Sequence, residues 1–165
     1  MRIISFKLLY GIVIDGHLRR KLIRVSVTTN PTAEWIAGQV TAAFPWNEAP
    51  RRLTRDRDRS FGPAYTHRIR AMGIRGHPTA PHSPWQNGYV ERLIGSIRRE
   101  CLDHMVVVGE ADLRRVLKAY ASYYNRVRTH LSLSKDAPLF RPSQTVGDIA
   151  AIPILGGLHH LYVRV

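Results

Sequence analysis

Two acidic residues of this chain have the type and spacing to bind a divalent cation together. Asp56 lies in "RRLTRDRDRSF", and Glu91 follows 35 positions later in "SPWQNGYVERLIGSIRREC". Carboxylate oxygens are hard ligands that suit divalent cations. A pair of such ions activates the attacking oxygen and stabilises the leaving oxygen when a phosphodiester is displaced in line. The pattern therefore predicts a metal site that acts on a phosphodiester, with the surrounding arginines holding the polyanion.

Both acids also have simpler explanations. Glu91 would pair with Arg92 or Arg98 on its own helix, a surface contact worth roughly 0–1 kcal/mol. Asp56 and Asp58 would form a solvated turn balanced by the arginines between and beside them. Spacing alone does not decide between these readings and a shared site.

The charge of the chain favours a polyanionic partner. Its 165 residues hold 25 Lys and Arg against 12 Asp and Glu, a formal net charge of +13 at pH 7 that is spread along the sequence. Nucleic acid is the first candidate and a membrane surface the weaker one. No segment is long enough to span a bilayer. Cys101 is the only cysteine, so no internal disulfide is expected and a cytoplasmic setting is predicted.

The elements ahead of Asp56 are predicted from β-rich runs and turn residues. "FKLLYGIVI" and "KLIRVSVTT" flank "DGHLRR" and predict two antiparallel strands that turn at Asp15-Gly16. Asn30 and Pro31 then predict the start of a helix, which ends before Pro45. "RRLTRDRD" is typical of a short strand that runs into a charged loop. Asp56 is therefore expected at the end of a strand.

A second group of elements is predicted to position Glu91. A helix through Tyr65 and Ile69 is expected to close at Gly73, and a short strand and a proline-rich loop follow it. From Asn87 onward a helix is predicted whose buried stripe is Val90, Leu93, Ile94, Ile97 and Cys101. A last long helix repeats the pattern at Leu113, Val116, Leu117, Tyr120 and Tyr124. Beyond Pro142 the chain is weakly patterned.

Three stretches together resemble a known family. "RDRD" followed by "GI", then "SPWQNGYVERLIGSIRRECLDH", then "YYNRVRTHLSLSKDAP" are similar to the integrase core of bacterial insertion-sequence transposases, relatives of retroviral integrases. The resemblance runs from about Phe6 to the "GGLHH" near the C-terminus. It divides the chain into an integrase core over residues 1–140 and a C-terminal tail over residues 141–165.

The resemblance implies a fold, a reaction and a cofactor. The fold is α/β and RNase H-like, with a central mixed sheet flanked by helices. The activity is DNA transposition and DNA integration, by metal-dependent strand transfer with Mg²⁺ or Mn²⁺. Asp56 matches the second aspartate of the family's catalytic triad and Glu91 matches its glutamate, while Asp58 fits the adjacent turn. The implied partners are the element ends, the target DNA and further copies of the chain assembled on DNA.

One residue of the family's pattern is absent. The first catalytic aspartate would fall at or before Met1, on a first strand that is expected to be incomplete. Asp15 is a weak substitute because an aspartate before glycine in a turn usually bonds its own backbone. We therefore expect a truncated and catalytically impaired copy, with a protein encoded in separate pieces as one alternative. The competing hypothesis is a non-catalytic nucleic-acid-binding remnant or accessory module of a transposase.

Residues around the glutamate are expected to touch DNA. Gln86 and Asn87 resemble the family's polar loop, although Asn87 also suits a helix N-cap. The basic residues of the same helix would contact phosphates or form a solvated face: Arg92, Arg98 and Arg99. Trp85 is predicted to pack the loop onto the domain, with stacking on a base as the alternative.

Other reactive side chains predict no further chemistry. The histidines His82, His104, His159 and His160 lack regular zinc-ligand spacing, and a single cysteine is available. Cys101 continues an apolar stripe, so its burial is expected.

Overall fold

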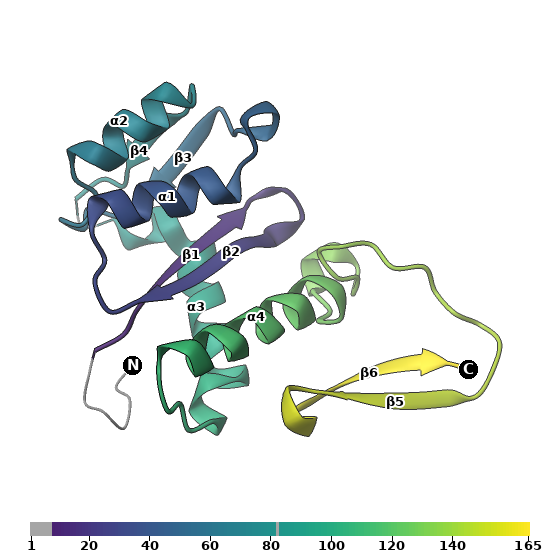
Figure 1. Ribbon diagram of the computed structural model, residues 1–165. Coiled ribbons are helices and arrows are strands. Elements are labelled where there is room, and N and C mark those ends of the chain that lie inside the picture. Colours follow the sequence, from purple (N-terminus) through teal and green to yellow (C-terminus); the bar gives the residue numbers. More distant parts are fainter. Residues whose placement is uncertain (1–7, 82) are drawn as a thin grey trace.

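The described residues form ten α-helices and β-strands, and the first eight follow the order that the sequence predicts. The computed structural model describes residues 8–81 and 83–165. In chain order the elements are β1 (Tyr10–Gly16), β2 (Lys21–Thr28), α1 (Ala33–Ala43), β3 (Arg52–Arg55), α2 (Pro63–Ala71), β4 (Arg75–Pro78), α3 (Gly88–Glu100), α4 (Glu110–Arg126), β5 (Ile149–Ile154) and β6 (His159–Arg164) (Figure 1). The predicted order of strand, strand, helix, strand, helix is confirmed.

Strands β1 and β2 form the predicted antiparallel hairpin, but its turn is longer than expected. Val13 lies opposite Val25, and a bulge follows Ile14. Asp15 and Gly16 are still paired with β2, so the prediction of a turn at these two residues is wrong. The chain instead reverses at residues 17–20, where Arg19 donates hydrogen bonds to the main-chain oxygens of residues 137 and 138. These distant acceptors hold the longer turn.

Helix boundaries follow local capping chemistry with small shifts. Helix α1 begins at Ala33, and the Thr32 hydroxyl accepts a hydrogen bond from the Trp35 amide at 3.1 Å. The predicted start at Asn30 was therefore two residues early. The helix ends before Pro45 as predicted. Gly73 follows α2 with a φ of 71°, a conformation that glycine adopts without strain.

The strands do not form the single central sheet that the sequence predicted. β1 pairs with β2, β3 pairs in parallel with β4, and β5 pairs with β6, as three separate two-stranded sheets. The expectation that the Asp56 strand shares a sheet with β1 is wrong for the described residues. One outer edge is covered, because the Asn125 side chain bonds both the amide and the carbonyl of Leu22 in β2.

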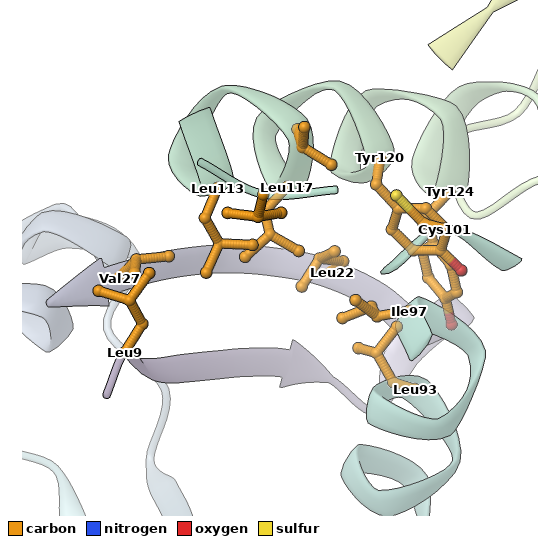
Figure 2. Close-up of a cluster of buried hydrophobic side chains, with 12 residues drawn as sticks. Leu9, Leu22, Val27, Leu93, Ile97, Cys101, Leu113, Leu117, Tyr120 and Tyr124 are labelled. Carbon is orange, nitrogen blue, oxygen red and sulfur yellow. The ribbon is translucent and has the colours of Figure 1, made fainter. Parts of the chain in front are cut away.

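Two apolar clusters pack against opposite faces of the β1–β2 hairpin. One lies between β2 and helices α3 and α4, and it includes Leu22 and Val27 of β2, Leu93 of α3 and Leu117 of α4 (Figure 2). The other joins Ile14 of β1 to α1 and α2. Helices therefore cover both sides of these strands, in keeping with the predicted mixed α/β architecture.

The predicted apolar stripe of α3 is only partly buried. Leu93 and Ile97 are buried, and Cys101 has no exposed surface, as expected. Ile94 is 38% exposed and Val90 is half-buried, so the prediction that they pack inward with Ile97 is wrong for Ile94. The C-terminal hairpin was not predicted. Within the described part of the chain, no helix is long and apolar enough to cross a membrane.

Candidate active-site groove between two strands

Asp56 and Glu91 line the same groove, although they come from different elements. Asp56 directly follows β3, and Glu91 lies in the first turn of α3. Both side chains are exposed. The groove has a volume of about 490 Å³, and its walls include residues of β1, α1, β3 and α3. The fold therefore brings the two acids to one concave surface that a substrate can reach.

The groove runs along the edges of two strands. Residues 10–15 of β1 and residues 52–56 at β3 line it without a gap in either run. Side chains alternate between the faces of a strand, so an uninterrupted run of lining residues indicates that the groove follows the strand edge. The opposite edges are occupied, since β1 pairs with β2 and β3 with β4. The groove is thus the space that separates the two sheets.

The acids of the groove differ in how their carboxylates are used. Asp58 accepts hydrogen bonds from the amide and hydroxyl of Ser60 at 2.7 and 2.6 Å, and these bonds lower its pKa. Its carboxylate therefore shapes the turn that follows Asp56. Asp56 accepts one weak bond, from the Asp58 amide at 3.3 Å. In the described residues no salt bridge involves Glu91, so its predicted surface pairing with Arg92 or Arg98 is not seen.

Asp15 is the fourth acid that lines this groove, but it does not complete a metal-binding cluster. It sits at the bulge of β1 and lines the groove. Burial raises its pKa, so its ionised form is less favoured than that of a solvated carboxylate. Among residues 8–81 and 83–165, no group of three or more His, Cys, Asp or Glu side chains is placed to hold a metal ion.

In the loop before α3, the side chain of Gln86 is held by a hydrogen bond, while the side chain of Asn87 makes no capping bond. The Gln86 side chain accepts a hydrogen bond from the Ala80 amide at 2.8 Å. Asn87 is the N-cap residue of α3, as its alternative prediction has it, and lines the groove, but its side chain makes no capping hydrogen bond. The predicted DNA-contacting arginines of α3, Arg92, Arg98 and Arg99, are all exposed.

Trp85 does not pack the loop onto the domain. Its side chain is 73% exposed, which contradicts the predicted plug and leaves the indole ring free to stack. We expect Trp85→Ala to change the free energy of unfolding by no more than about 0.5 kcal/mol, because little apolar surface is buried. The same variant should bind single-stranded DNA with a free energy that is roughly 1–3 kcal/mol less favourable, since each base stacked on an aromatic ring contributes that much.

The measurement is a fluorescence titration with a single-stranded oligonucleotide alongside thermal unfolding. Trp85→Phe is the control, because it keeps an aromatic face at the same position. A large loss of stability in Trp85→Ala would show that the ring is a structural plug. Unchanged affinity would show that it does not stack on a base.

Sequence reasoning missed the ion pair that holds α3 against the end of α4. Arg128 donates to both carboxylate oxygens of Glu100 at 2.8 and 2.7 Å, and the Tyr120 hydroxyl donates to the same carboxylate at 2.9 Å. These bonds lower the pKa of Glu100 despite its partial burial. Glu100 closes the helix that begins near Glu91, so the pair fixes the direction of that helix. Residues so far apart in sequence give no local signal of pairing.

The remaining candidate side chains have structural contacts. Rings of His104 and His159 bond the main-chain oxygens of Arg99 and Glu100, each at 2.8 Å. His82 lies outside the described residues. Burial raises the pKa of the Cys101 thiol to about 11, so it remains protonated and unreactive at neutral pH.

Comparisons with known proteins show which sequences and which fold the chain resembles. Residues 72–138 match the family described as integrase core domain, a stretch that includes Glu91. Over 131 residues the chain is 26% identical to an uncharacterized 39.2 kDa protein of insertion element IS476 from Xanthomonas euvesicatoria, and the match covers 76% of this chain and 36% of that protein. The chain thus spans about a third of the curated relative.

A solved structure shares the fold. It is a chain of the simian T-cell lymphotropic virus intasome in complex with PP2A regulatory subunit B56 gamma. The TM-score is 0.55 at 13% sequence identity, and the match covers 90% of this chain and 63% of that one. At this identity the likeness shows the fold alone, which is mixed α/β.

Proposed function

We propose that this chain, which carries an integrase core domain in residues 72–138, is part of a DNA transposase that transfers strands between element ends and target DNA. The observation that carries the proposal is the shared groove of Asp56 and Glu91. Two carboxylates on separate elements line this one groove in a chain of net charge +13. An acidic site within a basic protein suits a phosphodiester substrate whose charge is neutralised by cations and arginines.

The donor set suits Mg²⁺ or Mn²⁺. Asp56 and Glu91 offer carboxylate oxygens, the hard ligands that these cations prefer, and both are open to solvent. When bound, the ions would activate the attacking oxygen and stabilise the leaving one. The two acids would hold them at the groove, while Asp58 keeps the loop beside Asp56 in its turn.

Other residues of this surface would bind and orient the DNA. Arg92, Arg98 and Arg99 extend from the helix that carries Glu91 and are free to contact phosphates. Gln86 is held by the Ala80 amide, and Asn87 faces the groove, so both would lie beside a bound strand end. Phosphate contacts of this kind position DNA without reading its sequence.

The groove also has the form of a place for one further extended strand. The lining edges of β1 and β3 both offer main-chain groups along their length, and a strand between them would unite the two sheets. Peptides add to open sheet edges in this way through main-chain hydrogen bonds. A carboxylate on that strand would lie between Asp56 and Glu91 and supply the third acid. A chain without this third acid would be catalytically impaired.

The proposed reaction has consequences for location and assembly. We propose a bacterial DNA substrate, because the chain resembles a protein of a bacterial insertion element, and the cytoplasm is then the proposed setting. Joining two element ends to one target requires several copies on the DNA, so a homo-oligomer is the proposed active form.

A second candidate function is a non-catalytic nucleic-acid-binding module of a transposase. The specific observation in its favour is that the described residues hold no cluster of three metal-ligand side chains. The two candidates differ in one measurable property: only the catalytic one requires Asp56 and Glu91 to bind a cation together.

Manganese binding tests the proposed site without relying on activity. We expect Mn²⁺ to broaden the amide resonances around both Asp56 and Glu91 in the ¹⁵N-labelled chain, because its unpaired electrons relax nearby nuclei. Glu91→Gln should weaken this effect by about tenfold or more, since it removes one of two charged ligands. Asp103→Asn is the matched control, an exposed acid of the same basic chain that lies outside the groove. Broadening centred elsewhere, or unchanged in Glu91→Gln, would reject the catalytic candidate.

A further inference from the structure

A second and larger cavity lies at the other end of the molecule. It has a volume of about 1480 Å³ and lies between the end of α4, the segment that follows α4, and strands β5 and β6. We call it the C-terminal cleft. Figure 1 shows β5 and β6 as a separate hairpin that an extended connection joins to the end of α4.

The C-terminal cleft is strongly basic. Its lining contains the cationic side chains Arg19, Arg126, Arg128, Lys135, Arg141 and Arg164. Asp136 is the acid in that lining, and Glu100 pairs with Arg128 from outside it. Six cations against two carboxylates leave a surplus of four positive charges around one cavity.

Three of these cations are held in place by protein contacts. Arg19 pairs with Asp136 at 2.7 Å, and Arg128 pairs with Glu100. Arg164 donates to the carbonyl oxygens of Gln144 and Gly147, which fixes its position without cancelling its charge. These contacts give the cleft a defined basic wall.

The other three cations are available to a ligand. Arg126, Lys135 and Arg141 form no salt bridge with any residue that the structure describes. Arg126 and Lys135 are exposed, and Arg141 is half-buried. Guanidinium groups match phosphate geometry with two parallel hydrogen bonds, so this set favours phosphate over a simple counterion.

The hairpin that forms one wall is attached to the domain at one end. The His159 ring stacks on Tyr123 of α4 with centroids 4.1 Å apart, and its Nε2 atom lies 2.8 Å from the Glu100 carbonyl oxygen. Away from that point β5 and β6 pair only with each other in the described chain. An isolated two-stranded hairpin is marginally stable in water, so a bound partner would stabilise this wall.

Two exposed aromatic rings favour a nucleic acid strand over an anionic lipid surface as the ligand. Phe140 and Tyr162 line the cleft and are 76% and 65% exposed. Aromatic faces beside a basic groove are the combination that binds the sugars, bases and phosphates of a nucleic acid strand. An anionic lipid surface would use the charges but has no rings to stack.

From the cleft's charge, its aromatic rings and its partly attached wall, we infer that the C-terminal cleft is a second nucleic-acid-binding site that holds the sugar-phosphate backbone of a strand. The choice of nucleic acid rests on the proposed function. The site itself is separate from the groove of Asp56 and Glu91, so the two bind different stretches of nucleic acid.

The test is the affinity of the full chain for a fluorescein-labelled 30-base-pair duplex and the matching single strand, measured by anisotropy at several salt concentrations. The triple variant Arg126→Gln/Lys135→Gln/Arg141→Gln should lose about tenfold or more in affinity near 0.1 M salt. The slope of log affinity against log salt should become shallower by roughly 2–3, because each lost phosphate contact removes about 0.9 for duplex DNA.

A charge-matched variant separates a binding site from the effect of net charge. The control variant is Arg68→Gln/Arg70→Gln/Arg75→Gln. It removes three exposed arginines of α2 and β4, and none of these three side chains lines either cavity. It should retain most of its affinity. Equal losses in the two triple variants would overturn the inference. Circular dichroism melting of both variants verifies that they fold.

Further results would separate a lipid ligand from a nucleic acid, and the cleft from the proposed catalytic site. Binding to phosphatidylserine vesicles that depends on the cleft cations, with DNA affinity unchanged, would show that the ligand is a lipid surface and overturn the inference. A normal Mn²⁺ site together with unchanged DNA affinity in the cleft variant would reject the cleft and keep the catalytic proposal. Absence of the Mn²⁺ site, with DNA binding that still depends on the cleft cations, would reject the catalytic proposal and keep the cleft as a binding site.

Discussion

The 165-residue chain is expected to join no pre-processed element ends to a target duplex in Mg²⁺ or Mn²⁺. Two-ion catalysis needs a carboxylate that bridges both ions, and the groove brings Asp56 and Glu91 together without a third acid close enough to form a cluster in the described residues. One ion would therefore be under-coordinated. The measurement is the yield of joined product from labelled oligonucleotides on a denaturing gel.

The same groove offers a way to restore activity. A strand-forming extension of alternating Val and Thr with one Asp, fused ahead of Met1, is designed to pair with the edges of β1 and β3. Three fusions place the aspartate at successive positions along one face, because the pairing register of the strand decides which position lies beside Asp56 and Glu91. At least one should exceed its Asn counterpart by roughly a hundredfold, the scale on which one charge-stabilising group changes a rate.

Two outcomes would contradict this account. Metal-dependent joining by the unextended chain, abolished in Glu91→Gln, would show that the existing acids suffice, and Asp15→Asn would then test the third ligand. Equal joining by an aspartate fusion and its Asn counterpart would show that the extension acts through stability alone.

The second large effect is expected in the apolar core. Leu93 is 3% exposed and lies in the cluster between β2 and α4 (Figure 2), so Leu93→Ala should lower the free energy of unfolding by about 2–5 kcal/mol. For a chain of this size each kcal/mol shifts the melting temperature by about 2–4 °C. Urea unfolding followed by circular dichroism measures the change.

Its neighbour provides the matched control. Ile94 is 38% exposed and lines the groove, so Ile94→Ala should cost about 1 kcal/mol or less. Both variants shorten an aliphatic side chain to the same residue in the same helix, so helix propensity affects them almost equally. Equal costs would show that α3 buries both positions and that its assigned face is wrong.

Local chemistry in the sequence determined most of the elements and their order. Helical spacing predicted a buried stripe of Val90, Leu93, Ile94, Ile97 and Cys101, and of these Leu93, Ile97 and Cys101 are buried. Proline and glycine marked helix ends because they limit the backbone conformations of their own residues. Errors of one or two residues, as at Thr32, arose where several neighbouring residues offer equivalent caps. The two acids were selected from residue type, spacing and resemblance, and they do line one groove.

Tertiary structure alone decided how these elements combine. The sequence did not reveal that β1 and β3 belong to separate sheets, because strand pairing depends on partners far away in the chain. The turn at residues 17–20 is held by residues 136–138, and α3 is fixed by the pair of Glu100 with Arg128. The exposure of Trp85 and Ile94 likewise depends on which surfaces face the groove and which meet another helix. Local propensities carry no information about contacts across a hundred residues, so the groove and the C-terminal cleft appeared only in the folded chain.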